Sequence, residues 1–132
     1  EALEHVFGYA VGNDLTRRDL QRDARDHSRP WDTSKGFDHS AAIGAIHPAA
    51  LVGHIKDGSI RLQVNGELKQ QADIRDLIWS VPEIIAELST LFALQPGDLI
   101  FTGTPAGVSA VKVGDRMEGT IVGLDTLVNV VQ

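Results

Sequence analysis

The alternation of hydrophobic and polar residues along the chain predicts short strands and two substantial helices. Residues 59–64 alternate strictly between apolar and polar side chains, which is the period of a half-buried strand. Asn65-Gly66 then supplies the residue pair favoured in a tight hairpin turn. After Ser80, apolar residues recur at spacings of three and four, which predicts a helix to about Ala93. We expect the apolar stripe of that helix to cover a sheet.

The first part of the chain carries weaker patterns, interrupted by glycine and proline. Thr16 followed by Asp19 fits a capping box and marks the start of a helix. The elements predicted here are a helical lead at Leu3, a strand over 6–11, a helix over 17–26, a loop from Trp31 to Gly36 and a buried strand over 40–46.

The last part of the chain reads as short strands separated by turns. Its predicted elements are a turn at 96–98, a strand over 99–102, a glycine-rich connection over 102–107, and strands over 117–122 and 124–131. Strands do not alternate regularly with helices, so a doubly wound parallel sheet is a poor fit. We expect an α+β fold, mainly β, in which a mixed, largely antiparallel sheet is rolled on itself with helices outside.

Composition limits the classes of protein to which the chain can belong. With 132 residues, 42% of them hydrophobic, it is long enough for one domain with a modest core. The net charge of -6 disfavours nucleic acid and anionic membranes as partners. Cysteine is absent, which excludes disulfides and thiolate sites and is compatible with a reducing compartment, so we expect a cytoplasmic protein. No apolar run is long enough to span a membrane.

The arginines are concentrated in one helix. Five of the eight lie within 17–29 and are interleaved with aspartates, which is typical of a solvated helix face with ion pairs. We favour that interpretation for all of them except Arg18. Offsets of four and three from Asp14 place Arg18 and then Gln21 on one side of a helical turn if the helix begins early. An anion-binding side chain would then lie beside a carboxylate of the type that binds metal.

Taken singly, the candidate residues have ordinary explanations. An aspartate before a helix is more often a cap or turn residue, as for Asp14. Lys35 has the features of a surface lysine, and Thr104 those of a turn hydroxyl. Their order and surrounding sequence are more specific. The chain resembles the fumarylacetoacetate hydrolase family over nearly all of its length, through the strings GYAVGNDLTRRDLQ, KGFD, PGDLIFTGTPAGV and KVGDRMEGTIVGLDTL. The string RPWDTSKGFDHSA is most like the fumarylpyruvate hydrolase and acylpyruvase branch.

The resemblance implies a metal site and a set of substrate contacts. In that family Mg²⁺ or Mn²⁺ is held by two glutamates one residue apart and by an aspartate that corresponds to Asp14. Arg18 and Gln21 match substrate contacts, Lys35 matches the catalytic lysine beside the metal and the attacked carbonyl, and Thr104 matches the threonine that binds the substrate carboxylate. The implied activity is hydrolysis of a carbon–carbon bond in a small anionic diketo acid such as fumarylpyruvate, within aromatic catabolism, by a homodimer.

Two alternatives stay open. The resemblance also covers decarboxylases, isomerases and lyases of related oxo acids, and a noncatalytic fragment that only binds anions is the other alternative. The family's paired glutamates and its histidine–glutamate base should precede Gly8, yet Glu1 and Glu4 have the wrong spacing. The chain also enters predicted secondary structure directly, without an initial methionine. We therefore expect residues 1–132 to be the C-terminal part of a catalytic domain, inactive without its upstream part.

Overall fold

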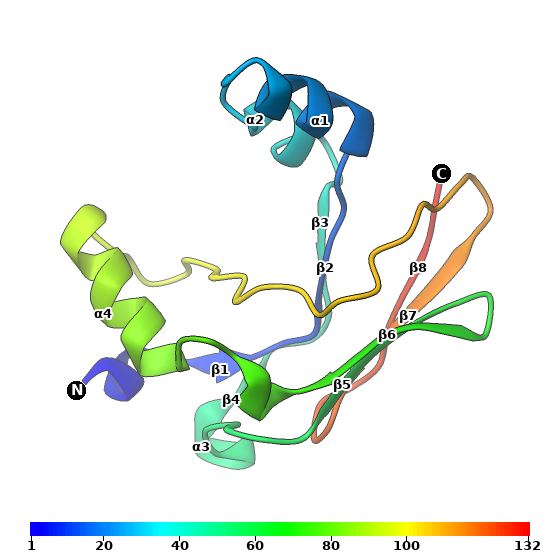
Figure 1. The fold of residues 1–132 in the computed structure, drawn as a ribbon. Coiled ribbons are helices and arrows are strands. Elements are labelled where there is room, and N and C mark those ends of the chain that lie inside the picture. Colours follow the sequence, from blue (N-terminus) through cyan, green and yellow to red (C-terminus); the bar gives the residue numbers. More distant parts are fainter.

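The computed structural model describes residues 1–132 and contains three antiparallel sheets with helices outside them (Figure 1). The helices are η1 (Ala2–His5), α1 (Arg18–Asp26), α2 (Asp32–Lys35), α3 (Ala49–Val52), η2 (Ile74–Asp76) and α4 (Val81–Leu91). The strands are β1 (Gly8–Tyr9), β2 (Gly12–Asp14), β3 (Ala41–Ile43), β4 (His47–Pro48), β5 (Ser59–Val64), β6 (Glu67–Asp73), β7 (Arg116–Ile121) and β8 (Leu127–Val130). The predicted α+β, largely antiparallel class is confirmed.

The largest sheet has the order β6-β5-β7-β8, and its first two strands form the predicted hairpin. Asn65 and Gly66 both have positive φ angles, 51° and 82°, as a type I′ turn requires. The Asn65 side chain also donates to Asp115 Oδ1 (2.9 Å) and accepts from the backbone N–H of Arg116 (2.9 Å). One asparagine therefore closes the hairpin and ties its turn to β7.

The predicted strand over 6–11 is divided in two. β1 pairs with β4, whereas β2 pairs with β3 and carries the chain toward α1. Gly8 permits the first pairing, because a Cβ there would lie 2.3 Å from the backbone oxygen of His47. The strand predicted over 40–46 shortens to β3, and its burial was wrong, since Ile43 is 40% exposed.

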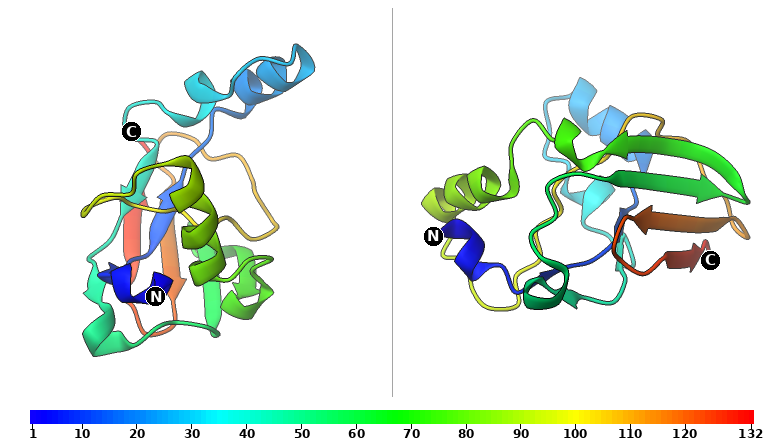
Figure 2. Two further views of the ribbon diagram at one scale, coloured as in Figure 1. Left: turned by 90° about the vertical axis from the view of Figure 1, so that its left-hand side faces the viewer. Right: turned by 90° about the horizontal axis from the view of Figure 1, so that it is seen from below.

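Helix α4 has the predicted start but a different neighbour. The backbone N–H and the hydroxyl of Ser80 both donate to Glu83 Oε2, at 2.7 and 2.6 Å, and these bonds lower the pKa of Glu83. The expectation that its apolar stripe covers a sheet was wrong: α4 packs against η1, and none of its residues is buried. Figure 2 shows α4 beside the N-terminus, away from the four-stranded sheet. The strand predicted over 99–102 is also absent, and this segment is extended without pairing.

The chain exposes more surface than a free-standing domain of its mass. Its accessible area is 9167 Å², whereas a compact monomer of 14.2 kDa exposes roughly 6,800 Å². Only 8 of 132 residues are buried, and large apolar side chains such as Phe7 (75% exposed) and Ile78 (96% exposed) lie open. The excess of about 2,400 Å² is larger than either partner's share of a standard protein interface, which is about 800 Å².

The small core lies where the β2–β3 ribbon crosses the four-stranded sheet. Val11 is 4% exposed and packs toward β7, where a Cβ on Gly119 would lie 3.0 Å from its side chain. Met117 is 2% exposed, and its sulfur accepts a hydrogen bond from Asn13 Nδ2 at 3.4 Å. The residues that precede Asp14 are therefore fixed against the sheet by packing.

Truncating this core should destabilise the protein measurably. We expect Met117→Ala to lower the free energy of unfolding by about 2–4 kcal/mol, because it removes a buried side chain and leaves a cavity. Arg22→Ala is the control, since Arg22 lies on the exposed, charged face of α1, and it should change that energy by less than about 0.5 kcal/mol. Urea denaturation of the natural full-length protein measures both, and equal midpoints for the two variants would contradict this description of the core.

Candidate functional site

The candidate site begins at Asp14, the last residue of β2. Lys35 Nζ lies 2.7 Å from each Asp14 carboxylate oxygen and donates a third hydrogen bond to Thr16 Oγ1 at 2.9 Å. The Asp14 and Lys35 side chains are 37% and 35% exposed, so the pair is half-buried and open to solvent. Two of the sequence candidates, 21 positions apart in the chain, therefore meet directly.

The geometry differs in detail from the sequence expectations. Helix α1 begins at Arg18, so Asp14 belongs to a strand and does not share a helical turn with Arg18. Thr16 forms no capping box; its hydroxyl accepts the bond from Lys35 instead. Lys35 itself ends the short helix α2 and is not in a loop.

Helices α1 and α2 form one unit beyond the end of β2 (Figure 1). The backbone N–H of Arg17 donates to the Ser34 carbonyl at 3.0 Å, and the fully buried Ser34 hydroxyl donates to the Trp31 carbonyl at 2.6 Å. The Arg17 guanidinium also lies 4.3 Å from the centre of the Phe37 ring, a cation–π contact. These contacts fix the turn from which Lys35 reaches back to Asp14.

Arg18 and Gln21 lie together on α1. Arg18 Nη1 donates to Gln21 Oε1 at 2.5 Å, which leaves the Gln21 amide nitrogen available as a donor. Neither residue lines the pocket next to Asp14. Of the arginines predicted on an ion-paired helix face, Arg25 pairs with Asp26 and Arg29 with Asp23, whereas Arg17 and Arg22 form no ion pair.

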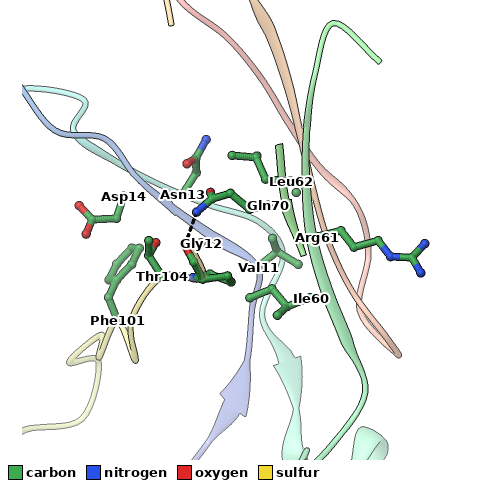
Figure 3. Close-up of a pocket in the computed structure, with 13 residues that line it drawn as sticks. Val11, Gly12, Asn13, Asp14, Ile60, Arg61, Leu62, Gln70, Phe101 and Thr104 are labelled. Carbon is green, nitrogen blue, oxygen red and sulfur yellow. Dashed lines mark hydrogen bonds between the residues drawn. The ribbon is translucent and has the colours of Figure 1, made fainter. Parts of the chain in front are cut away.

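A pocket of about 100 Å³ lies beside Asp14 and is bounded by β2, the hairpin and the segment 101–105 (Figure 3). Asp14 and Thr104 both line it, so the structure brings together the predicted metal ligand and the predicted carboxylate contact. Phe101 and Gln70 also line it, and the Arg61 side chain points away from the other labelled residues (Figure 3). Phe101 and Gln70 carry no sequence signal that marks them as pocket residues.

The chain supplies one candidate ligand, Asp14, for a divalent cation. Each carboxylate oxygen of Asp14 accepts one bond from Lys35 and retains a lone pair for a second partner. A hard divalent cation prefers such oxygen ligands but needs several of them. The structure contains no group of three histidine, aspartate or glutamate side chains that could hold a metal ion. The residues present therefore fit a metal only if other ligands come from outside this chain.

Comparison with known proteins decides the family. The family model described as "Fumarylacetoacetate (FAA) hydrolase C-terminal" matches residues 1–132. The chain belongs to the fumarylacetoacetate hydrolase family. The resemblance drawn from its motifs is confirmed.

Similar members of the fumarylacetoacetate hydrolase family have more than one activity. A fumarylpyruvate hydrolase of Ralstonia sp is 51% identical over 94% of this chain and 64% of its own length. An oxaloacetate tautomerase of Arabidopsis thaliana is 38% identical over 93% of the chain and 56% of its own. A crystal structure of fumarylpyruvate hydrolase from Pseudomonas aeruginosa, in complex with Mn²⁺ and pyruvate, has a TM-score of 0.96 and 56% identity over 98% of this chain and 56% of that one. The chain thus spans less than two thirds of each of these relatives.

Proposed function

We propose that this chain is part of a metal-dependent hydrolase that cleaves the carbon–carbon bond of fumarylpyruvate or another acylpyruvate, giving pyruvate and a second acid. The observation that carries the proposal is the Asp14–Lys35 pair at a pocket that Thr104 also lines. The similarity to fumarylpyruvate hydrolases of Ralstonia and Pseudomonas supports this substrate class.

The proposed active site needs residues from polypeptide beyond this chain. The large exposed apolar surface and the single metal-type carboxylate both call for further residues packed against it. We propose that residues 1–132 are the C-terminal part of one catalytic domain whose other part supplies the remaining metal ligands and the general base. Asp14 would hold Mg²⁺ or Mn²⁺ together with those ligands. The bound ion would supply Lewis-acid stabilisation of negative charge on the reacting oxygens.

The residues of this chain would bind and polarise the substrate. Thr104 donates its hydroxyl proton to the carboxylate of the pyruvyl end. Lys35 places a positive charge beside the carbonyl that water attacks, so that it stabilises the oxyanion and the departing enolate. Arg18 binds the far carboxylate, and the Gln21 amide, held by its bond to Arg18, donates alongside it. Water adds to one carbonyl, the carbon–carbon bond breaks, and the enolate takes a proton to become pyruvate.

Metal-dependent turnover of fumarylpyruvate tests the proposed function. The natural full-length protein should consume fumarylpyruvate in the presence of Mn²⁺ or Mg²⁺, and removal of the metal with EDTA should abolish the activity. Residues 1–132 alone should show none, because the ligand set is incomplete. Loss of the ultraviolet absorbance of the diketo acid and release of pyruvate measure the reaction.

Two other outcomes would favour the alternatives. Enzyme that leaves fumarylpyruvate intact but interconverts or decarboxylates oxaloacetate would support the second candidate, which the oxaloacetate tautomerase relative favours. Inactivity of the full-length protein toward all these acids would support a noncatalytic anion-binding role.

No helix of the chain has the length and apolar character needed to cross a membrane. We further propose a cytoplasmic homodimer that acts in aromatic catabolism, which gel filtration and cell fractionation would test.

A further inference from the structure

The segment that carries Thr104 has almost no hydrogen bonding of its own. Residues 99–111 form no backbone–backbone hydrogen bond to any part of the chain. One side-chain bond reaches them: Gln70 Nε2 donates to the Pro105 carbonyl at 2.6 Å (Figure 3). Proline has no N–H, so at this position the segment offers only an acceptor, and a donor is required to hold it.

Close packing fixes the segment on either side of that bond. The Phe101 ring lies over Gly12, where a Cβ would be 2.7 Å from the ring. Gly107, with φ of 100°, approaches β6 so closely that a Cβ would lie 2.2 Å from the Lys69 carbonyl oxygen. Thr104 lies between these two contacts and directly precedes the residue that Gln70 holds.

We propose that Gln70 is a positioning residue for the substrate site: by holding the Pro105 carbonyl it sets where the Thr104 hydroxyl stands in the pocket beside Asp14. Gln70 is 9% exposed, so water competes little for this bond, and loss of the donor would leave a carbonyl without a partner. The inference rests on the proposed function insofar as Thr104 binds a carboxylate. The holding of the segment itself does not depend on it.

The test compares two methionine substitutions in the natural full-length protein. Gln70→Met keeps the length of the side chain and removes the donor. Gln71→Met makes the same change at the next residue of β6, which is exposed and projects to the opposite side of the sheet. The rate of thermolysin cleavage within residues 99–111, the affinity for pyruvate with Mn²⁺ present, and the separate values of kcat and KM are measured.

For Gln70→Met we expect cleavage within 99–111 to accelerate about tenfold and the affinity for pyruvate to fall about tenfold, the scale of one lost buried hydrogen bond. KM should rise with kcat nearly unchanged, and cleavage elsewhere in the chain should not change. Gln71→Met should match the unsubstituted protein. Wild-type cleavage and pyruvate affinity in Gln70→Met would overturn the proposal.

Two further variants separate the possible failures. If Gln70→Met does not fold, Gln70→Asn, which draws the donor back by one carbon, must accelerate the same cleavage or the proposal is wrong. Thr104→Val should lower pyruvate affinity without altering cleavage within 99–111. Failure of the unsubstituted protein to bind pyruvate would refute the proposed function, whereas unchanged cleavage in the Gln70 variants would refute the role of Gln70.

Discussion

Replacing Asp14 with alanine is expected to reduce metal-dependent turnover of the full-length protein by at least about 100-fold. Losing even a residue that only orients a ligand weakens metal binding or activity by about 10–100-fold, and Asp14 would be a ligand itself. The affinity for Mn²⁺, measured by calorimetry, should fall in parallel. Asp14→Asn should behave similarly, because it keeps the shape of the side chain and removes its charge.

The hairpin offers a matched control for the Asp14 variants. Glu67 Oε2 also lies 2.7 Å from a lysine nitrogen, that of Lys69, but on the exposed hairpin and outside the pocket. Glu67→Ala therefore removes a carboxylate with the same kind of partner, and it should leave turnover and Mn²⁺ affinity within about twofold, as expected for a surface pair. An Asp14→Ala enzyme as active as this control would rule out Asp14 as a metal ligand.

Replacing Lys35 with methionine should lower kcat without weakening the affinity for the metal. We expect kcat to fall by about 100- to 1,000-fold, the usual cost of losing one group that stabilises an oxyanion. The affinity for Mn²⁺ should be equal or higher, because the variant removes a cation that lies 2.7 Å from both Asp14 oxygens. This combination distinguishes a catalytic lysine from one that only supports the metal site.

The controls for Lys35→Met address charge and folding. Lys56→Met removes an exposed lysine outside the pocket and should leave kcat unchanged. Thermal unfolding of the Lys35 variant should stay close to that of the unsubstituted protein, because a half-exposed ion pair contributes less than about 1 kcal/mol. A Lys35→Met enzyme with a normal kcat would show that Lys35 takes no part in the reaction.

Local sequence patterns correctly predicted those helices and strands that interactions between neighbouring residues determine. The alternation over 59–64 and the Asn65-Gly66 turn produce the β5–β6 hairpin, and the Ser80–Glu83 pair begins α4. The apolar run over 6–11 leads into β2, whose last residue is Asp14. The partner of α4 could not be read in the same way, because an apolar stripe indicates burial without indicating what provides it.

Of the two pocket residues that could not be found from the sequence, Gln70 was hidden by an irregularity in the hairpin. A regular two-residue hairpin would put Lys69 opposite Leu62, and Gln70 would then face away from the pocket. A register shift between Leu62 and Gln63 instead pairs Leu62 with Gln70 and turns the glutamine inward. No residue type in the strand signals that bulge.

The contacts among the candidate residues are also long-range. Lys35 meets Asp14 because α2 folds back through Ser34 and Arg17, and Thr104 reaches the pocket beside Asp14 on a segment without regular structure. Periodicity carries no information on such contacts, so spacing alone wrongly put Asp14 on a helical turn with Arg18. The motifs of the family, by contrast, identified residues that the structure brings to one pocket, namely Asp14 and Thr104.

The most direct test is crystallographic. Crystals of the natural full-length protein grown with Mn²⁺ and pyruvate would be measured at the manganese absorption edge, where anomalous density locates the ion without assumption. We expect a single strong peak bonded to an Asp14 carboxylate oxygen, with carboxylates from outside residues 1–132 completing its ligands and the pyruvate carboxylate at Thr104. A manganese peak remote from Asp14, or none at all in an enzyme that is active, would contradict the account.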